Sequence, residues 1–463
     1  MAGIAGISNN NKQEQVFRML EKISHRGQAG SKVIQGPNAT LGAVWPEAQA
    51  KQTPPTLRGQ AAWDGGYPPV PDVDLLLQAW EPTVLAADTP RGLFLARDPL
   101  GIRPLYYGHC GAETMCFASE VKALLELTHD IHEFPPGAYY DPQHGFQSYS
   151  QVEAALPMEQ KTGEMVHGLR LRLEQAISRR VDDEQMGCWL SGGLDSSAMA
   201  ALVRPHVRRL HTFAAGVSGA PDLEFAAQVA DFLGTDHQEV VVTLDELLAV
   251  LPDVIYYLES FDALLVRSSI TNYLVARRAA DYAASVFSGE GGDELFAGYS
   301  YLKEIDLDEI PKELVDITQR LHNTALQRVD RSASANGLAV HVPFLDTDVV
   351  EYALRIPPQL KLHDDGELTE KWIVRQALVG ALPEAVLWRP KAKFWEGAGV
   401  GDLLSLYAQE KISDTEFHCE RWLPNGWCLN TKEELMYYRI FHEHFGDLED
   451  LSWMGRTKGS PLE

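Results

Sequence analysis

Residues 191–197 read Ser-Gly-Gly-Leu-Asp-Ser-Ser, and they follow the apolar run Met186-Gly187-Cys188-Trp189-Leu190. An apolar run of this length that leads into a glycine-rich turn predicts a buried strand, and a helix is expected to begin near Ala198. Two glycines allow the backbone to approach a ligand closely, and successive backbone N–H groups in such a turn can hold an anion. The positive end of the following helix would point at the same place. The stretch therefore predicts a strand–loop–helix unit with an anion site in the loop.

Asp195 is an unusual residue for an anion site, because its carboxylate would repel the ligand. A Mg²⁺ ion between the carboxylate and a phosphate would remove that conflict, since Mg²⁺ prefers hard oxygen ligands. The stretch lacks the Gly-Lys-Ser/Thr ending of the ordinary nucleotide P-loop. It resembles instead the pyrophosphate loop of ATP pyrophosphatases, which cleave ATP to AMP and pyrophosphate. The alternative is a Gly/Ser turn that only caps a helix.

A second constellation, Ser288-Gly289-Glu290-Gly291-Gly292-Asp293-Glu294, follows a strand predicted over residues 284–288. Three carboxylates within five residues would repel one another if enclosed, so Mg²⁺ or a protonated amine is expected beside them. A solvated acidic turn is the alternative. Positive charge is available downstream from Lys371, from Arg375 and from the run Arg389–Lys393.

The length and composition restrict the classes of protein that fit. A chain of 463 residues exceeds one ordinary core, so two domains are expected. A formal net charge of −25 argues against a nucleic-acid or membrane-surface protein, whose binding faces are basic. The sequence predicts neither a signal peptide nor a membrane span. Five scattered cysteines fit neither a disulfide framework nor a paired zinc ribbon, so a reducing, cytoplasmic setting is expected.

The pattern of elements changes near the end of the first third of the chain. Residues 1–150 contain short strand-like pieces with many Gly and Pro breaks, which predict an all-β or layered α+β domain. Residues 145–160 are polar and aperiodic, and we expect them to form a linker. From residue 160 to 463, strand–helix alternation predicts a parallel sheet with helices on both faces, followed by mostly amphipathic helices after Ile305.

The chain resembles the glutamine-dependent asparagine synthetase family across nearly its whole length. The matching pieces are Gly3–Ile7, His25-Arg26-Gly27, Arg97–Gly101, Phe117–Leu124, Phe134–Gly137, Leu190–Ser197, Ser288–Glu294, Arg331–Gly337, Val342–Asp346 and Trp388–Gly399. The resemblance implies an α/β protein with two domains. Residues 1–150 would form a layered α+β domain of N-terminal-nucleophile (Ntn) type, like class II glutamine amidotransferases. Residues 160–463 would form an ATP-pyrophosphatase-type domain, in which ATP activates aspartate as β-aspartyl-AMP and ammonia displaces AMP.

The resemblance also implies roles for the residues at matching positions. Asp195 and Asp293 would bind Mg²⁺, Glu290 would act as the base for the incoming amine, and Lys371 would stabilise charge on the transferred phosphates. ATP and its pyrophosphate would be bound by Leu190, Ser191, Gly192, Gly193, Leu194, Asp195, Ser196, Ser197, Ser288 and Gly289.

The first domain departs from the family at the positions of its glutaminase chemistry. That chemistry needs a cysteine directly after the initiator methionine, and this chain has Ala2 there. The arginine that would hold the glutamine carboxylate aligns with Trp45, and the asparagine of the oxyanion hole aligns with Asp64. Asp72 keeps the family's place for binding the glutamine amine. A lone Cys→Ala change could be an engineered trap, but three losses together favour a decayed glutaminase whose domain remains as a scaffold.

These observations predict an ATP-dependent amide-forming ligase that takes a small carboxylic acid, with aspartate favoured, and ammonia or another amine. The alternative is a specialised biosynthetic amide ligase, similar to β-lactam synthetases or lasso-peptide cyclases. Glu290 favours the first reading, because β-lactam synthetases place a tyrosine there. Leu264 and Leu265, where relatives often carry hydroxyl residues, leave the acid and the amine open, with core packing as the alternative explanation. A binding protein without catalysis is the third reading. No nucleic-acid or membrane partner is expected, and a homodimer remains open.

Overall fold

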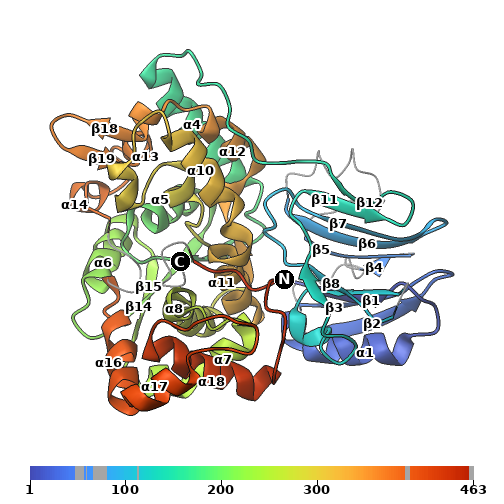
Figure 1. Cartoon of the computed structure of the whole chain (residues 1–463). Helices are drawn as coiled ribbons and strands as arrows, with labels where there is room; N and C mark the ends of the chain where they lie inside the picture. The colour runs from blue at the N-terminus through green and yellow to red at the C-terminus, as the bar shows by residue number, and fades with distance from the viewer. Residues whose placement is uncertain (47–56, 59, 66–80, 112–113, 392–396, 458–463) are drawn as a thin grey trace.

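The first third of the chain forms two antiparallel sheets that lie one above the other (Figure 1). The structure is a computed structural model, and it describes all residues except 47–56, 59, 66–80, 112–113, 392–396 and 458–463. One sheet has the order β10 (Ile131–Glu133), β8 (Tyr106–His109), β9 (Met115–Ala118), β1 (Gly3–Ile7), β3 (Thr40–Trp45), β2 (Gly30–Gln35). The other has the order β12 (Gly145–Ser148), β11 (Ala138–Asp141), β7 (Gly92–Arg97), β6 (Thr83–Thr89), β5 (Ala61–Gly65), β4 (Leu57–Arg58).

Helix α1 (Gln13–Lys22) covers the first of these sheets and completes a layered α+β arrangement. Val16, Met19 and Leu20 form its buried face. Gly42 of β3 allows this close packing, because a Cβ there would lie 2.8 Å from both Leu20 and Val16. All five residues of β1 are buried, as expected for a strand covered on both faces. The prediction of a linker over residues 145–160 is wrong for its first part, because residues 145–148 pair with β11 as the edge strand β12.

The second part of the chain is built on a parallel sheet, as the strand–helix alternation predicts. Its order is β15 (Asp236–Val241), β14 (Arg209–Gly216), β13 (Gln185–Trp189), β16 (Ser285–Phe287), β17 (Ala339–His341). All four pairings in this sheet are parallel. After β13, the chain adds β14 and β15 on one side of that strand, and later it adds β16 and β17 on the other side. The carboxyl ends of β13 and β16 therefore flank a topological switch point, where ligands bind in open α/β sheets.

Helices cover both faces of this sheet and fill the rest of the second part (Figure 1). Helix α6 (Pro221–Leu233) has Pro221 in its first turn and is capped by Gly234 with φ 63°, and α7 (Leu244–Leu258) begins with a Thr243–Glu246 capping box. The remaining helices and a small hairpin are α4 (Thr162–Ser178), α5 (Leu194–Val203), α6 (Pro221–Leu233), α7 (Leu244–Leu258), α8 (Ala263–Ala279), α9 (Gly292–Leu295), α10 (Ile310–Gln319), α11 (Ala325–Ser334), α12 (Thr347–Leu354), β18 (Leu362–Asp364), β19 (Leu368–Glu370), α13 (Trp372–Ala377), α14 (Glu384–Leu387), α16 (Gly401–Lys411), α17 (Asp414–Glu420) and α18 (Lys432–Phe445).

The two parts share an extensive core. One cluster of buried apolar side chains combines Ala5, Val16 and Tyr106 with Leu251 of α7 and Phe441 of α18. The division into residues 1–150 and 160–463 therefore remains a prediction about folding units. In the part of the chain that the structure describes, no helix is long and apolar enough to cross a membrane.

Candidate active site

The 191–197 loop lies at the carboxyl end of β13, and its own side chains brace it. The hydroxyl of Ser196 accepts a hydrogen bond from the backbone N–H of Ser191 at 3.1 Å and donates to the carbonyl of Gly193 at 3.1 Å. Gly192 adopts φ +70°, and a Cβ there would lie 2.5 Å from Phe225. The helix α5 begins at Leu194, four residues before the expected start, because this bracing turns the chain directly into the helix. The N-terminus of a ten-residue helix therefore faces the loop.

The second loop, which follows β16, packs directly against the first. A Cβ on Gly289 would lie 2.7 Å from the backbone of Asp195, and a Cβ on Gly292 would lie 2.6 Å from its carboxyl group. Ser288 is held at the sheet edge by a 2.9 Å hydrogen bond from its N–H to the carbonyl of His341. The glycines of the acidic stretch therefore have a steric function, since any side chain would separate the two loops.

Lys371 lies between the two aspartates that the sequence assigns to a metal. Its ammonium is 2.5 Å from a carboxylate oxygen of Asp195 and 2.5 Å from one of Asp293. Lys391 lies 2.6 Å from the other oxygen of Asp293. Burial raises the pKa of Asp195, whereas Lys371 and Lys391 outweigh burial at Asp293 and lower its pKa. Lys371 has φ 55°, an unusual conformation for a residue with a side chain, which is typical of functional sites.

The donor set at this point suits Mg²⁺. Two carboxylates converge, and the Oδ1 atom of Asp195 is buried without a hydrogen-bond partner among the described residues. Within the described ranges, three or more His, Cys, Asp or Glu side chains do not gather into a metal cage. Mg²⁺ often takes one or two protein carboxylates and completes its shell with phosphate oxygens and water. Asp195 and Asp293 fit that pattern.

A cleft of about 550 Å³ opens beside this cluster and is lined by Arg375, Arg389 and Lys391 as well as by residues of the predicted site. The guanidinium of Arg389 donates a hydrogen bond of 3.1 Å to the carbonyl of Gly192, and it lies 2.6 Å from the carboxylate of Asp222. Arg375 lies 2.7 Å from Glu370. The sequence shows that the run Arg389–Lys393 is basic, but spacing alone does not reveal which loop Arg389 and Lys391 reach. The cleft is lined by Ser191, Gly193, Leu194, Asp195, Ser196, Asp222, Glu370, Lys371, Arg375, Arg389, Pro390 and Lys391.

Glu290 is not among these lining residues. Its carboxylate lies 2.6 Å from the guanidinium of Arg328 on α11. Burial opposes the charge of Arg328, but Glu290 outweighs it and raises the pKa of the guanidinium. Arg328 is not identifiable from the sequence, because one arginine on a helix carries no signal of its distant partner.

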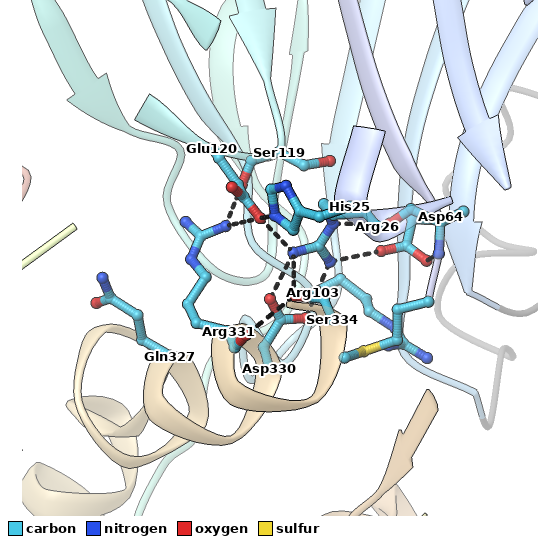
Figure 2. A network of polar contacts seen from close by, with 12 residues as sticks. His25, Arg26, Asp64, Arg103, Ser119, Glu120, Gln327, Asp330, Arg331 and Ser334 are labelled. Carbon is cyan, nitrogen blue, oxygen red and sulfur yellow. Dashed lines mark hydrogen bonds and ion pairs between the residues drawn. The ribbon is translucent and has the colours of Figure 1, made fainter. Parts of the chain in front are cut away.

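Three of the four residues predicted to form a decayed glutaminase site are described by the structure, and they lie around the start of β1. The backbone N–H of Ala2 donates to Asp64 at 3.0 Å, and the Asp64 carboxylate lies 3.4 Å from Arg26. Figure 2 shows Arg26 between Asp64 on one side and Asp330 on the other. Trp45 ends β3, whose partner strand is β1. Asp72 lies outside the described residues.

The two leucines near residue 264 occupy different environments at the start of α8. Leu265 is 3% exposed and belongs to the shared core, whereas Leu264 is partly exposed. Core packing therefore accounts for Leu265, and an effect of Leu264 on the substrate wall stays a prediction.

Comparisons with known proteins match both parts of the chain. A family model described as asparagine synthase matches residues 168–317 and 306–460, and one described as glutamine amidotransferase domain matches residues 84–164. The chain is 37% identical over 389 residues to a probable asparagine synthetase (glutamine-hydrolyzing) of Schizosaccharomyces pombe, covering 76% of this chain and 69% of that protein. It is 35% identical over 376 residues to asparagine synthetase B (glutamine-hydrolyzing) of Escherichia coli, covering 76% and 67%. The amidotransferase match begins after Ala2, Trp45, Asp64 and Asp72.

Proposed function

The chain belongs to the asparagine synthase family, and we propose that it amidates aspartate without using glutamine, giving asparagine with ammonia or the N-substituted amide with another small amine. It is an ATP-dependent ligase that forms an amide by adenylating a carboxylate, and its fold combines an Ntn-type amidotransferase domain with an ATP-pyrophosphatase-type domain. The identity of the acid, the nitrogen source, the cytoplasmic setting and the loss of glutaminase activity belong to the proposal.

The observation that carries the proposal is the position of Lys371 between Asp195 and Asp293, beside the 191–197 loop. In the first half-reaction, a carboxylate oxygen attacks the α-phosphorus of ATP and pyrophosphate leaves. The backbone N–H groups of the loop and the N-terminus of α5 would hold the departing phosphates. Lys371, Lys391 and Arg389 would stabilise the charge that develops on them. Mg²⁺ held by Asp195 and Asp293 would neutralise phosphate charge when bound.

In the second half-reaction, an amine attacks the acyl carbon of the adenylate and AMP leaves. Ammonium must lose a proton before it can attack, and a carboxylate close to the acyl group can accept it. We assign that role to Glu290, which projects from the same loop as Asp293. Its ion pair with Arg328 fixes the carboxylate in one orientation.

The loss of glutaminase activity is supported by the surroundings of Ala2. A methyl group replaces the nucleophile, and the neighbouring Asp64 carboxylate would repel an oxyanion rather than stabilise it. The Asp64 carboxylate accepts a hydrogen bond from the backbone N–H of Ala2 and another from Arg26. Asp64 is therefore part of a buried polar network rather than a donor for an oxyanion.

The test is pyrophosphate release with ATP and Mg²⁺ against a panel of acids, each tried with ammonia, glutamine and small amines. We expect release with aspartate, asparagine formation with ammonia, and no glutamate from glutamine. Turnover only with another acid would refute the assignment of aspartate and favour a specialised biosynthetic amide ligase. No pyrophosphate release and no ATP–pyrophosphate exchange with any acid would refute catalysis.

A further inference from the structure

Helix α11 links the N-terminal domain to the loop that carries Glu290. Three charged side chains on this helix form ion pairs with three different parts of the fold. Arg328 pairs with Glu290, Asp330 pairs with Arg26, and Arg331 pairs with Glu120 and Glu259. The apolar side of the helix, formed by Leu326, Val329 and Ala333, is buried in the core of the second part.

The contact between Arg26 and Asp330 is a two-pronged ion pair without solvent. The two terminal nitrogens of Arg26 lie 2.7 and 3.0 Å from the two carboxylate oxygens of Asp330. Arg26 is fully buried and Asp330 is 2% exposed. Paired parallel hydrogen bonds of this type fix orientation as well as distance. Figure 2 shows the pair beside α11, with Ser334 close to it.

A second contact holds the same helix through the neighbouring residue. Arg331 lies 2.8 Å from Glu120 of the N-terminal domain and 3.0 Å from Glu259. The Glu259 carboxylate also accepts hydrogen bonds from the backbone N–H groups of Val121 and Lys122. Glu259 has φ 57° and is completely buried, so its conformation depends on these partners. The N-terminal domain thus fixes α11 at two adjacent residues.

Arg328 lies on the same helix, three residues before Arg331. A shift of α11 would therefore move Arg328 together with Asp330 and Arg331, because a helix turn is stiff. The Arg328–Glu290 pair is partly exposed, with side-chain exposures of 15% and 20%, so the surrounding core constrains it less than it constrains Asp330. The position of the Glu290 carboxylate consequently depends on where the N-terminal domain holds α11.

We propose that the N-terminal domain positions Glu290 for amide transfer, with Arg26 and Asp330 as the positioning residues and α11 and Arg328 as the connection. The inference rests on the proposed role of Glu290. It gives the domain a function in the synthetase reaction that does not require glutamine hydrolysis. The two half-reactions should respond differently, because the phosphate cleft draws its lining from other segments.

The test compares ATP–pyrophosphate exchange with amide yield on the same preparations of Asp330→Asn. This change is nearly isosteric and leaves Arg26 paired with Glu120 and Asp64. We expect amide yield to fall by about 10–10²-fold while exchange stays within about twofold, since small misplacements of catalytic groups have effects of that size. Arg26→Lys, which keeps the charge but not the paired geometry, should show the same selective loss. Glu14→Gln, which removes an exposed ion pair with Arg18 in the same domain, is the control and should change neither activity.

A double variant separates positioning from general destabilisation. In the Glu290→Gln background, Asp330→Asn should lower amide yield no further, because the group that it positions is already absent. Equal losses of exchange and amide, additive losses in the double variant, or an unchanged Asp330→Asn enzyme would each overturn the proposal. A loss in Glu290→Gln with no effect of Asp330→Asn refutes the positioning role alone. An unchanged amide yield in Glu290→Gln refutes both the proposed role of Glu290 and the inference built on it.

Discussion

The carboxylate of Glu290 lies 2.6 Å from the guanidinium of Arg328, and both residues are at most one-fifth exposed. An arginine partner limits the rotation of a carboxylate side chain. Glu290 therefore presents its carboxylate to an incoming ammonium ion in a fixed geometry. The partner also distinguishes Glu290 from Asp293, whose carboxylate is held by Lys371 and Lys391 beside the phosphate cleft.

Replacing Glu290 should separate the two half-reactions. We expect Glu290→Gln to form acyl-adenylate while amide product falls by roughly 10²–10⁴-fold, the range for a positioned general base. The amide of glutamine can still accept a hydrogen bond from Arg328, so the loop should keep its structure. ATP–pyrophosphate exchange and amide yield are measured together. Equal losses of both would place Glu290 with the metal and pyrophosphate machinery.

Neutralising either aspartate beside Lys371 should stop adenylation. Asp195→Asn and Asp293→Asn each remove a hard anionic ligand from the expected Mg²⁺–pyrophosphate cluster and a partner of Lys371. We expect pyrophosphate release to disappear while the circular dichroism spectrum stays native. Asp222→Asn, which alters the nearby Arg389 pair without touching the metal position, is the comparison and should retain measurable release. Near-normal release from either cluster variant would reduce these carboxylates to structural residues.

Restoring the missing thiol should not restore glutamine hydrolysis. Ala2→Cys supplies a nucleophile, but Asp64 still places a carboxylate within hydrogen-bond distance of residue 2, where an oxyanion donor is needed. We expect no glutamate when this variant is incubated with glutamine, measured by coupled glutamate oxidation. Robust glutaminase activity would show that Ala2 is the single lesion and that the alignments of Trp45 and Asp64 are wrong.

The contact between the two parts of the chain should weaken in acid. His322 and Arg97 outweigh the effect of burial on Glu133 and lower its pKa from 4.5 to about 2. A carboxylate with a depressed pKa stabilises the fold above its unfolded pKa, and this stabilisation disappears as pH falls from 4.5 towards 2. The shift corresponds to about 3 kcal/mol at neutral pH.

Glu133→Gln removes this contribution and provides the measurement. The difference in unfolding free energy between the native protein and the variant should be larger at pH 6 than at pH 3, as followed by urea titration. Glu126→Gln, which removes an exposed pair with Lys22, is the control and should show a small difference at both pH values. A difference for Glu133→Gln that does not change with pH would show that the carboxylate is not charged in the folded state.

The local sequence pattern was sufficient to predict several elements and the two ligand loops. Strand β16 covers Ser285–Phe287, within the residues 284–288 where the sequence predicts a strand. The loops after β13 and β16 were expected at one edge of a parallel sheet, and the structure brings them into contact through Gly289 and Gly292. A strand and the loop that follows it depend on residues within a few positions of one another, so the sequence contains the information for each of them.

Other features were decided only by tertiary structure. Helix α5 begins at Leu194 rather than near Ala198, because the Ser196 hydroxyl closes the loop on itself. The contact of Lys371 with Asp195 spans 176 positions in the chain, and that of Asp330 with Arg26 spans 304. Composition and periodicity identify a lysine or an arginine on a helix but not the carboxylate it meets. That partner is determined when sheets and helices pack, because a buried charge requires a counter-charge and only the packed fold specifies which one lies within reach.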